Sequence, residues 1–109
     1  MSDARVGTNV DRVFAALADP TRRELLEALG RRPASSATML AEQVPVSRQA
    51  VAKHLATLRE SRLVTSRRAG KEVLFSVRPD ELAATASWMT KLASTWQERL
   101  QLLKQAAES

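Results

Sequence analysis

Apolar residues recur along most of the chain three or four positions apart, which is the spacing of one helix face. This pattern predicts five helices, at residues 10–18, 20–30, 36–43, 47–60 and 80–105. Between residues 63 and 77 the period changes from 3.6 to 2, which is typical of strands. We therefore expect a β-hairpin here, with the dipeptide Ala69-Gly70 as its turn.

Residues that favour helix ends lie at the expected boundaries. Asp19 is a good N-cap and Pro20 suits the first position of the second helix. Either Ser35 or Ser36 can cap the third helix, and Ser47 can cap the fourth. The chain therefore contains two short helices joined by a tight turn, and a hairpin follows them.

This order of elements predicts a winged helix-turn-helix fold, mostly α-helical, with about five helices and a two-stranded wing. The chain has 109 residues, which is the size of one domain. We expect residues 1–109 to form that single domain, with dimerisation helices at residues 10–18 and 80–105. The fourth helix, at residues 47–60, and the wing, at residues 63–77, would form its functional part.

The positive charge is concentrated in this part of the chain. The whole sequence has 17 Lys and Arg against 12 Asp and Glu, a net charge of +5. Residues 48–78 hold eight basic and two acidic side chains, a net charge of +6, so the remainder carries −1. A basic helix and hairpin suit double-stranded DNA as the partner, although a solvated basic face has the same composition.

Composition excludes several other functions. The chain has no cysteine, one histidine and three glycines, and it shows no Ser/His/Asp arrangement or glycine-rich phosphate loop. We therefore expect no enzyme, no metal site and no cofactor. Residues 1–9 do not resemble a signal peptide, and no run approaches the roughly 20 apolar residues of a membrane span. A soluble cytoplasmic protein without a membrane partner is expected.

The outer face of the fourth helix has the residue types that read DNA bases. Alanine lets the backbone approach the major groove, glutamine suits adenine, and arginine or lysine suits guanine. The expected base-reading residues are Arg48, Gln49, Ala52 and Lys53. Contacts with the DNA backbone are expected from the rest of this helix and from the wing, at Ser47, Thr57, Arg67, Arg68 and Lys71. At least one of Arg22 and Arg23 is expected to form a buried or interface salt bridge rather than to read bases.

The last helix carries a seam of apolar residues seven positions apart, and it is longer than a small domain can cover. This indicates a homodimer interface completed by the first helix. The expected interface residues are Val10, Phe14, Leu17, Leu82, Met89, Trp96, Leu100 and Leu103. A ligand cavity beside Trp88 or Trp96 is the alternative use of these side chains.

Two motifs together carry a family resemblance: A-D-P-T-R-R at residues 18–23 and S-x-x-A-V-x-K-H-L-x-x-L at residues 47–58. With the hairpin at residues 67–77, they resemble the ArsR family of small dimeric winged-helix repressors. The resemblance implies a homodimer that represses transcription from a partly palindromic operator, with His54 flanking the recognition helix near the phosphates. It also indicates the metal-independent branch, because the thiol and histidine ligands of the metal sensors are missing. A small-molecule effector stays unidentified, and a winged-helix module that binds another protein is the alternative function.

Overall fold

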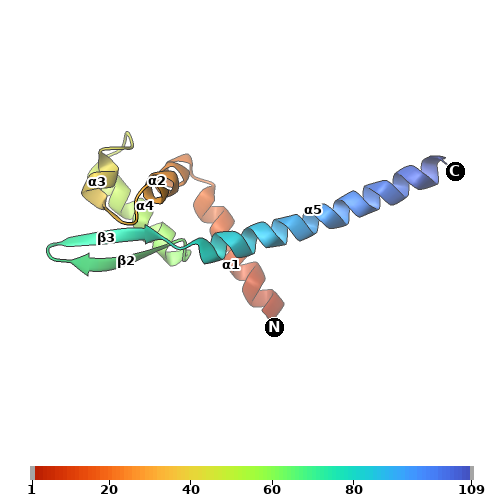
Figure 1. The fold of residues 1–109 in the computed structure, drawn as a ribbon, viewed down its shortest axis with the longest axis horizontal. Coiled ribbons are helices and arrows are strands. Elements are labelled where there is room, and N and C mark those ends of the chain that lie inside the picture. Colours follow the sequence, from red (N-terminus) through yellow and green to blue (C-terminus); the bar gives the residue numbers. More distant parts are fainter. Residues whose placement is uncertain (1, 109) are drawn as a thin grey trace.

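The structure, a computed structural model, describes residues 2–108, which form five helices and a three-stranded antiparallel sheet (Figure 1). This confirms the mostly helical winged helix-turn-helix fold. The elements are α1 (Ser2–Leu17), α2 (Pro20–Gly30), β1 (Ser35–Ser36), α3 (Ala37–Ala41), α4 (Arg48–Glu60), β2 (Val64–Ala69), β3 (Glu72–Val77) and α5 (Pro79–Glu108). Helix α1 begins eight residues earlier than expected, and α3 ends two residues earlier.

Side-chain caps fix where the helices begin. The Asp19 carboxylate accepts hydrogen bonds from the backbone N–H groups of Thr21, at 2.8 Å, and Arg22, at 3.2 Å. The Ser36 hydroxyl accepts one from the backbone N–H of Met39 at 3.2 Å, so Ser36 rather than Ser35 caps α3. Each cap satisfies backbone donors that have no partner inside the helix.

Helix α4 ends in a Schellman motif that leads directly into the wing. The N–H of Leu63 donates to the carbonyl of Leu58, and the N–H of Arg62 donates to that of Arg59, both at 3.0 Å. Leu58 and Leu63 are both fully buried, which supplies the usual apolar contact of this motif. Arg62 has a φ of 62°, a left-handed conformation that normally favours glycine.

The sheet has the strand order β1-β3-β2, so β3 lies between the other two. Ala69 pairs with Glu72, which makes Gly70 and Lys71 the two-residue turn of the wing. The expected turn, Ala69-Gly70, was therefore wrong by one residue. Gly70 has a φ of 64° at the first turn position, as a type II′ hairpin requires. Strand β1 is not among the elements expected from the sequence, because two residues are too few to show a period.

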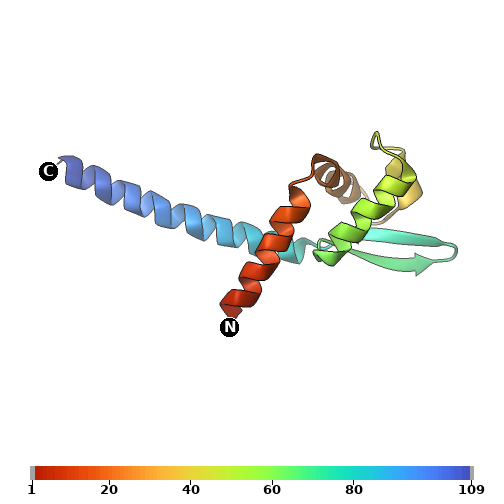
Figure 2. The same ribbon diagram turned by 180° about the vertical axis from the view of Figure 1, so that it is seen from behind.

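The core lies between the sheet and helices α1 to α4. It is built mostly from aliphatic side chains that are fully buried, including Leu25, Leu29, Leu40, Leu55, Leu58 and Leu63. Phe75 and Val77, on one face of β3, pack against this cluster. Figure 2 shows α4 above the wing hairpin in that view, with the C-terminal end of the helix at the base of the hairpin. The core therefore sets the orientation of α4 relative to the wing.

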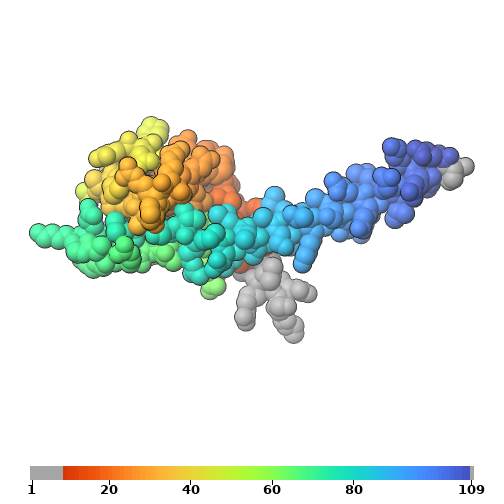
Figure 3. Space-filling model, viewed as in Figure 1, coloured from red at the N-terminus to blue at the C-terminus, as the bar shows by residue number. Residues whose placement is uncertain are grey.

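Helix α5 leaves this body as a long arm (Figure 3), which gives the molecule dimensions of 68 × 33 × 21 Å. Its first turns are anchored: Leu82 packs against the core, Thr85 is buried, and Glu81 accepts a hydrogen bond from the side chain of Asn9 on α1. From residue 86 to residue 108 every position is exposed. Within the described chain, no helix is both long and apolar enough to span a membrane.

Candidate DNA-binding surface

Helix α4 turns one face to the core and the opposite face outward. The hydroxyl of Ser47 caps it by accepting a hydrogen bond from the N–H of Ala50 at 3.1 Å. Its inward face is fully buried and consists of Val51, Leu55 and Leu58. The four expected base-reading side chains are all exposed: Arg48, Gln49, Ala52 and Lys53. Three of them, Arg48, Gln49 and Ala52, line a shallow hollow of about 440 Å³ at the start of the helix.

A second hollow, of about 410 Å³, joins α4 to the wing and to the start of α3. Three of its lining residues, Arg48, Arg59 and Lys71, are basic, and only Glu72 is acidic. Arg59 also donates a hydrogen bond to the hydroxyl of Ser66 on β2 at 3.1 Å. Arg59 is absent from the residues expected to contact DNA. Its position on the same side of the α4 helical wheel as Arg48 is the signal that could have identified it.

The strand register separates the two wing arginines. Arg68 pairs with Val73, whose face of β3 also carries Phe75, which packs on the core. Arg67 pairs with Leu74, on the opposite face of the sheet. Arg68 therefore lies on the side of the sheet that faces α4, and Arg67 lies on the outer side. Both side chains are exposed.

His54 and Thr57 lie on the side of α4 that faces α1 and α2, not on its exposed face. The ring Nδ1 of His54 lies 3.3 Å from a guanidinium nitrogen of Arg22. Thr57 is half-buried, and its hydroxyl donates to the carbonyl of Lys53 at 3.4 Å. The Nδ1 atom of His54 and the hydroxyl of Thr57 therefore already have partners inside the chain.

Arg22 connects three helices through a single guanidinium group. Its Nε and Nη2 donate to the carbonyls of Ala16, at 2.7 Å, and Ala15, at 3.2 Å, at the end of α1. Nη1 lies 3.8 Å from the carboxylate of Asp19 and also contacts His54 on α4. The expectation that Arg22 or Arg23 forms a salt bridge is confirmed for Arg22.

The same contacts affect Asp19. Desolvation raises the pKa of its carboxyl, but the hydrogen bonds from the backbone N–H groups of Arg22 and Thr21 lower it, as do the nearby charges of His54 and Arg22. The net result is a pKa below the ordinary value of 3.8. Asp19 is therefore held as a carboxylate at the start of α2, where negative charge is favourable.

A second surface is apolar and lies on α5 and the neighbouring part of α1. Its large side chains are between 39% and 66% exposed, and they are Phe14, Trp88, Met89, Leu92, Trp96, Leu100, Leu102 and Leu103. The rings of Phe14 and Trp88 meet edge to face, with their centroids 5.9 Å apart. Of the expected interface residues, Val10 is only 4% exposed, and Leu17 and Leu82 pack against the chain's own core. These three side chains serve the fold of one chain.

Comparisons with known proteins agree with this architecture. A family described as a helix-turn-helix domain matches residues 17–67, from the end of α1 into β2. The HTH-type transcriptional regulator Rv2034 of Mycobacterium tuberculosis is 45% identical over 74 residues, which are 68% of each protein. The structure of an ArsR-like transcriptional regulator from Rhodococcus sp. RHA1 is 44% identical, covers 94% of this chain and 95% of its own, and superposes with a TM-score of 0.84. The chain belongs to the ArsR family.

The transcriptional repressor SdpR of Bacillus subtilis is a further relative, 29% identical over 80 residues that cover 73% of this chain and 88% of that protein. Proteins of the ArsR type are DNA-binding transcriptional regulators and not enzymes, so the family expected from the two motifs at residues 18–23 and 47–58 is confirmed. Among residues 9–108, whose side chains the structure describes, no group of three His, Cys, Asp or Glu side chains is arranged to hold a metal ion.

Proposed function

We propose that this ArsR-family chain is a homodimeric repressor that binds an imperfect inverted-repeat operator through α4 and the wing. The observation that carries the proposal is the exposed face of α4, where small and hydrogen-bonding side chains lie beside a basic hollow shared with the wing. Ala52 and Ala56 let the helix approach the floor of the major groove. Arg48, Gln49 and Lys53 then reach the base edges.

The wing and its surroundings act on the phosphates. Lys71 and Arg59 share the basic hollow with Arg48, so a phosphate strand that crosses it meets three positive charges. Arg68 lies on the side of the sheet that faces α4. Such contacts set the position and orientation of α4 on the duplex and carry little sequence information. Ser47 adds a contact at the start of α4. His54 and Thr57 face α1 and α2, and Arg67 lies on the outer side of the sheet, so these three contribute less.

The apolar stripe of α5 supports the homodimer. On a helix with 3.6 residues per turn, five of its exposed side chains fall within about 80° of one another: Met89, Leu92, Trp96, Leu100 and Leu103. Exposed apolar stripes of this kind are buried by a second helix, and Phe14 with Trp88 extends the stripe onto α1. A two-fold dimer places two copies of α4 about 34 Å apart, in successive major grooves.

DNA binding is tested by fluorescence anisotropy with the upstream region of the protein's own gene and with random duplex of equal length. We expect the upstream region to bind more tightly, and the affinity to fall steeply with salt. Gln49→Ala should reduce the binding free energy by about 1–3 kcal/mol for the specific sequence and by little for random DNA. Lys71→Ala should weaken both equally. Equal affinity for the two duplexes at moderate salt would overturn the repressor and favour a protein-binding module.

Dimerisation is tested by light scattering on the purified chain at micromolar concentration. We expect a dimer for the unaltered protein and a monomer for Trp96→Glu, because a charge would be buried in the seam without a partner. Ser94→Glu, which adds the same charge on the opposite face of α5, is the matched control and should stay dimeric. A monomeric unaltered chain would contradict the proposal.

A further inference from the structure

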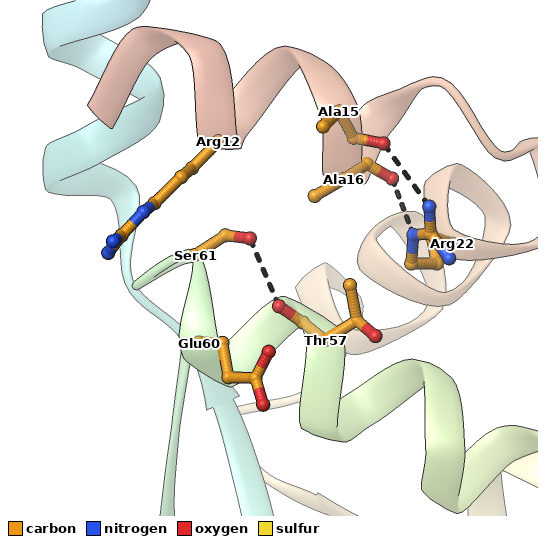
Figure 4. Close-up of a pocket in the computed structure, with 7 residues that line it drawn as sticks. All are labelled: Arg12, Ala15, Ala16, Arg22, Thr57, Glu60 and Ser61. Carbon is orange, nitrogen blue, oxygen red and sulfur yellow. Dashed lines mark hydrogen bonds between the residues drawn. The ribbon is translucent and has the colours of Figure 1, made fainter. Parts of the chain in front are cut away.

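A third hollow, of about 510 Å³, lies between α1 and the C-terminal half of α4, away from the DNA-binding face (Figure 4). It is lined by Arg12, Ala15 and Ala16 of α1, by Arg22 at the start of α2, by Thr57 and Glu60 of α4, and by Ser61, the C-cap of α4. Its volume falls within the range of about 300–1,000 Å³ that is usual for small-molecule sites. It is also distinct from the apolar stripe, because Phe14 points from α1 toward α5 and Trp88.

The walls of this hollow combine an apolar floor with unpaired charges. Ala16 is only 1% exposed and forms part of the floor. Arg12 and Glu60 are exposed, and neither takes part in a hydrogen bond or ion pair with any described residue. Figure 4 shows Arg12 and Arg22 toward opposite ends of the hollow, with Glu60 on the α4 side. Because Arg22 is already paired with Asp19, the Arg12 guanidinium and the Glu60 carboxylate are the charged groups of the lining that are free to bind a ligand.

We propose that this hollow binds a small organic carboxylate that also carries a hydrogen-bond donor, such as a hydroxyl or an ammonium group. The ligand carboxylate pairs with Arg12, and guanidinium groups are well suited to bidentate contact with carboxylates. The donor group faces Glu60, and the apolar body of the ligand covers Ala15 and Ala16. Each polar group that the ligand buries thereby has a partner.

The position of the hollow links this ligand to DNA binding, a consequence that rests on the proposed function. Arg22 forms part of its wall and holds the end of α1 to His54 of α4. The apolar body of the ligand covers Ala15 and Ala16, whose carbonyls accept the hydrogen bonds of Arg22, so the bound ligand lies against the contact that joins α1 to α2 and α4. The ligand therefore changes how α4 is held against α1, the helix that adjoins the proposed dimer interface. Because such coupling is reciprocal, DNA must change ligand affinity by the same factor.

The site itself is tested on the DNA-free protein by NMR titration with two probes, benzoate and 4-hydroxybenzoate, and with benzamide as the uncharged control. We expect saturable shifts confined to the amides of residues 12–16, 22 and 57–61, and none with benzamide. Arg12→Gln should weaken 4-hydroxybenzoate about tenfold, the scale of one charge-assisted hydrogen bond. Arg32→Gln removes the same charge outside the hollow and should leave the affinity unchanged. Glu60→Gln should reduce the preference for 4-hydroxybenzoate over benzoate.

No saturable shift with either acid, or an equal loss of affinity in Arg12→Gln and Arg32→Gln, would overturn the site. The amide spectra of the variants show in the same experiment that each is folded. The coupling is tested by repeating the titration with the operator present, where we expect a change of several-fold in probe affinity. An unchanged affinity would overturn the coupling alone. Failure of the proposed function would appear separately, as loss of specific DNA binding without any probe.

Discussion

Replacing Arg62 with glycine should stabilise this protein, although the change removes a large side chain. Arg62 occupies the left-handed position of the Schellman motif between α4 and the wing, with a φ of 62°. Its side chain is exposed and makes no ion pair or hydrogen bond with another described residue. The substitution therefore changes the backbone energy and one surface charge, and it leaves the core contacts of Leu58 and Leu63 in place.

The magnitude follows from two opposing terms. A residue with a Cβ atom in the left-handed region costs about 1–2 kcal/mol. Glycine removes that strain, but it gives the unfolded chain extra freedom worth about 0.5–1 kcal/mol. The net gain is about 0.5–1 kcal/mol, which raises the Tm of a domain of this size by about 4 °C.

Urea or thermal unfolding followed by circular dichroism measures this gain, at a fixed protein concentration because a dimer's stability depends on concentration. Arg62→Ala is the matched control, since it loses the same charge but keeps the Cβ atom, and it should be no more stable than the unaltered protein. Gly70→Ala should have the opposite effect and lower the free energy of unfolding by about 1 kcal/mol. A Cβ at Gly70 meets no atom within 4 Å, so its φ of 64° alone sets that cost. An Arg62→Gly variant no more stable than Arg62→Ala would refute the reasoning.

Two further predictions concern the helix cap and the wing. Because Asp19 has a lowered pKa in the folded state, its charge stabilises the fold fully above pH 3.8, and this contribution is lost as the pH falls through the folded-state pKa. Asp19→Asn keeps the cap and should be less stable at pH 7, with urea midpoints that converge with those of the unaltered protein as the pH falls below 3.8; a constant difference would contradict this. In the wing, Arg68→Ala should reduce affinity for all duplexes more than Arg67→Ala in an anisotropy assay, because only Arg68 faces α4. Equal losses would mean that both sheet faces meet DNA.

The sequence was most informative where local chemistry decides the structure. Asp19 and Ser47 begin helices as their side chains predict, because each satisfies nearby backbone N–H groups. The burial of Val51 and Leu55 follows from the helical period. The same period predicts that the four expected base-reading residues are exposed, because they lie on the opposite face of the helix.

Features that depend on contacts distant in sequence were not predictable in this way. Strand β1 exists because Ser35 and Ser36 pair with β3, some 40 residues further along the chain. The seven-residue period of the last helix identifies an apolar side, but it does not tell which positions the chain covers itself. Leu82 belongs to the chain's own core, whereas Trp96 is 55% exposed. The hollow between α1 and α4 likewise depends on how two separate helices pack.

The exposed C-terminal part of α5 has few contacts within the chain that could keep it helical. From residue 86 onward the helix is exposed along its whole length, so its persistence depends on intrinsic propensity and on contacts such as that of Arg99 with the ring of Trp96. Most of the stability of helices in proteins comes from packing of an apolar face rather than from intrinsic propensity. In a homodimer, this segment is held by the partner helix, so it unfolds together with separation of the two chains. Amide hydrogen exchange in residues 92–108 should then slow as protein concentration rises, while exchange in α4 changes far less.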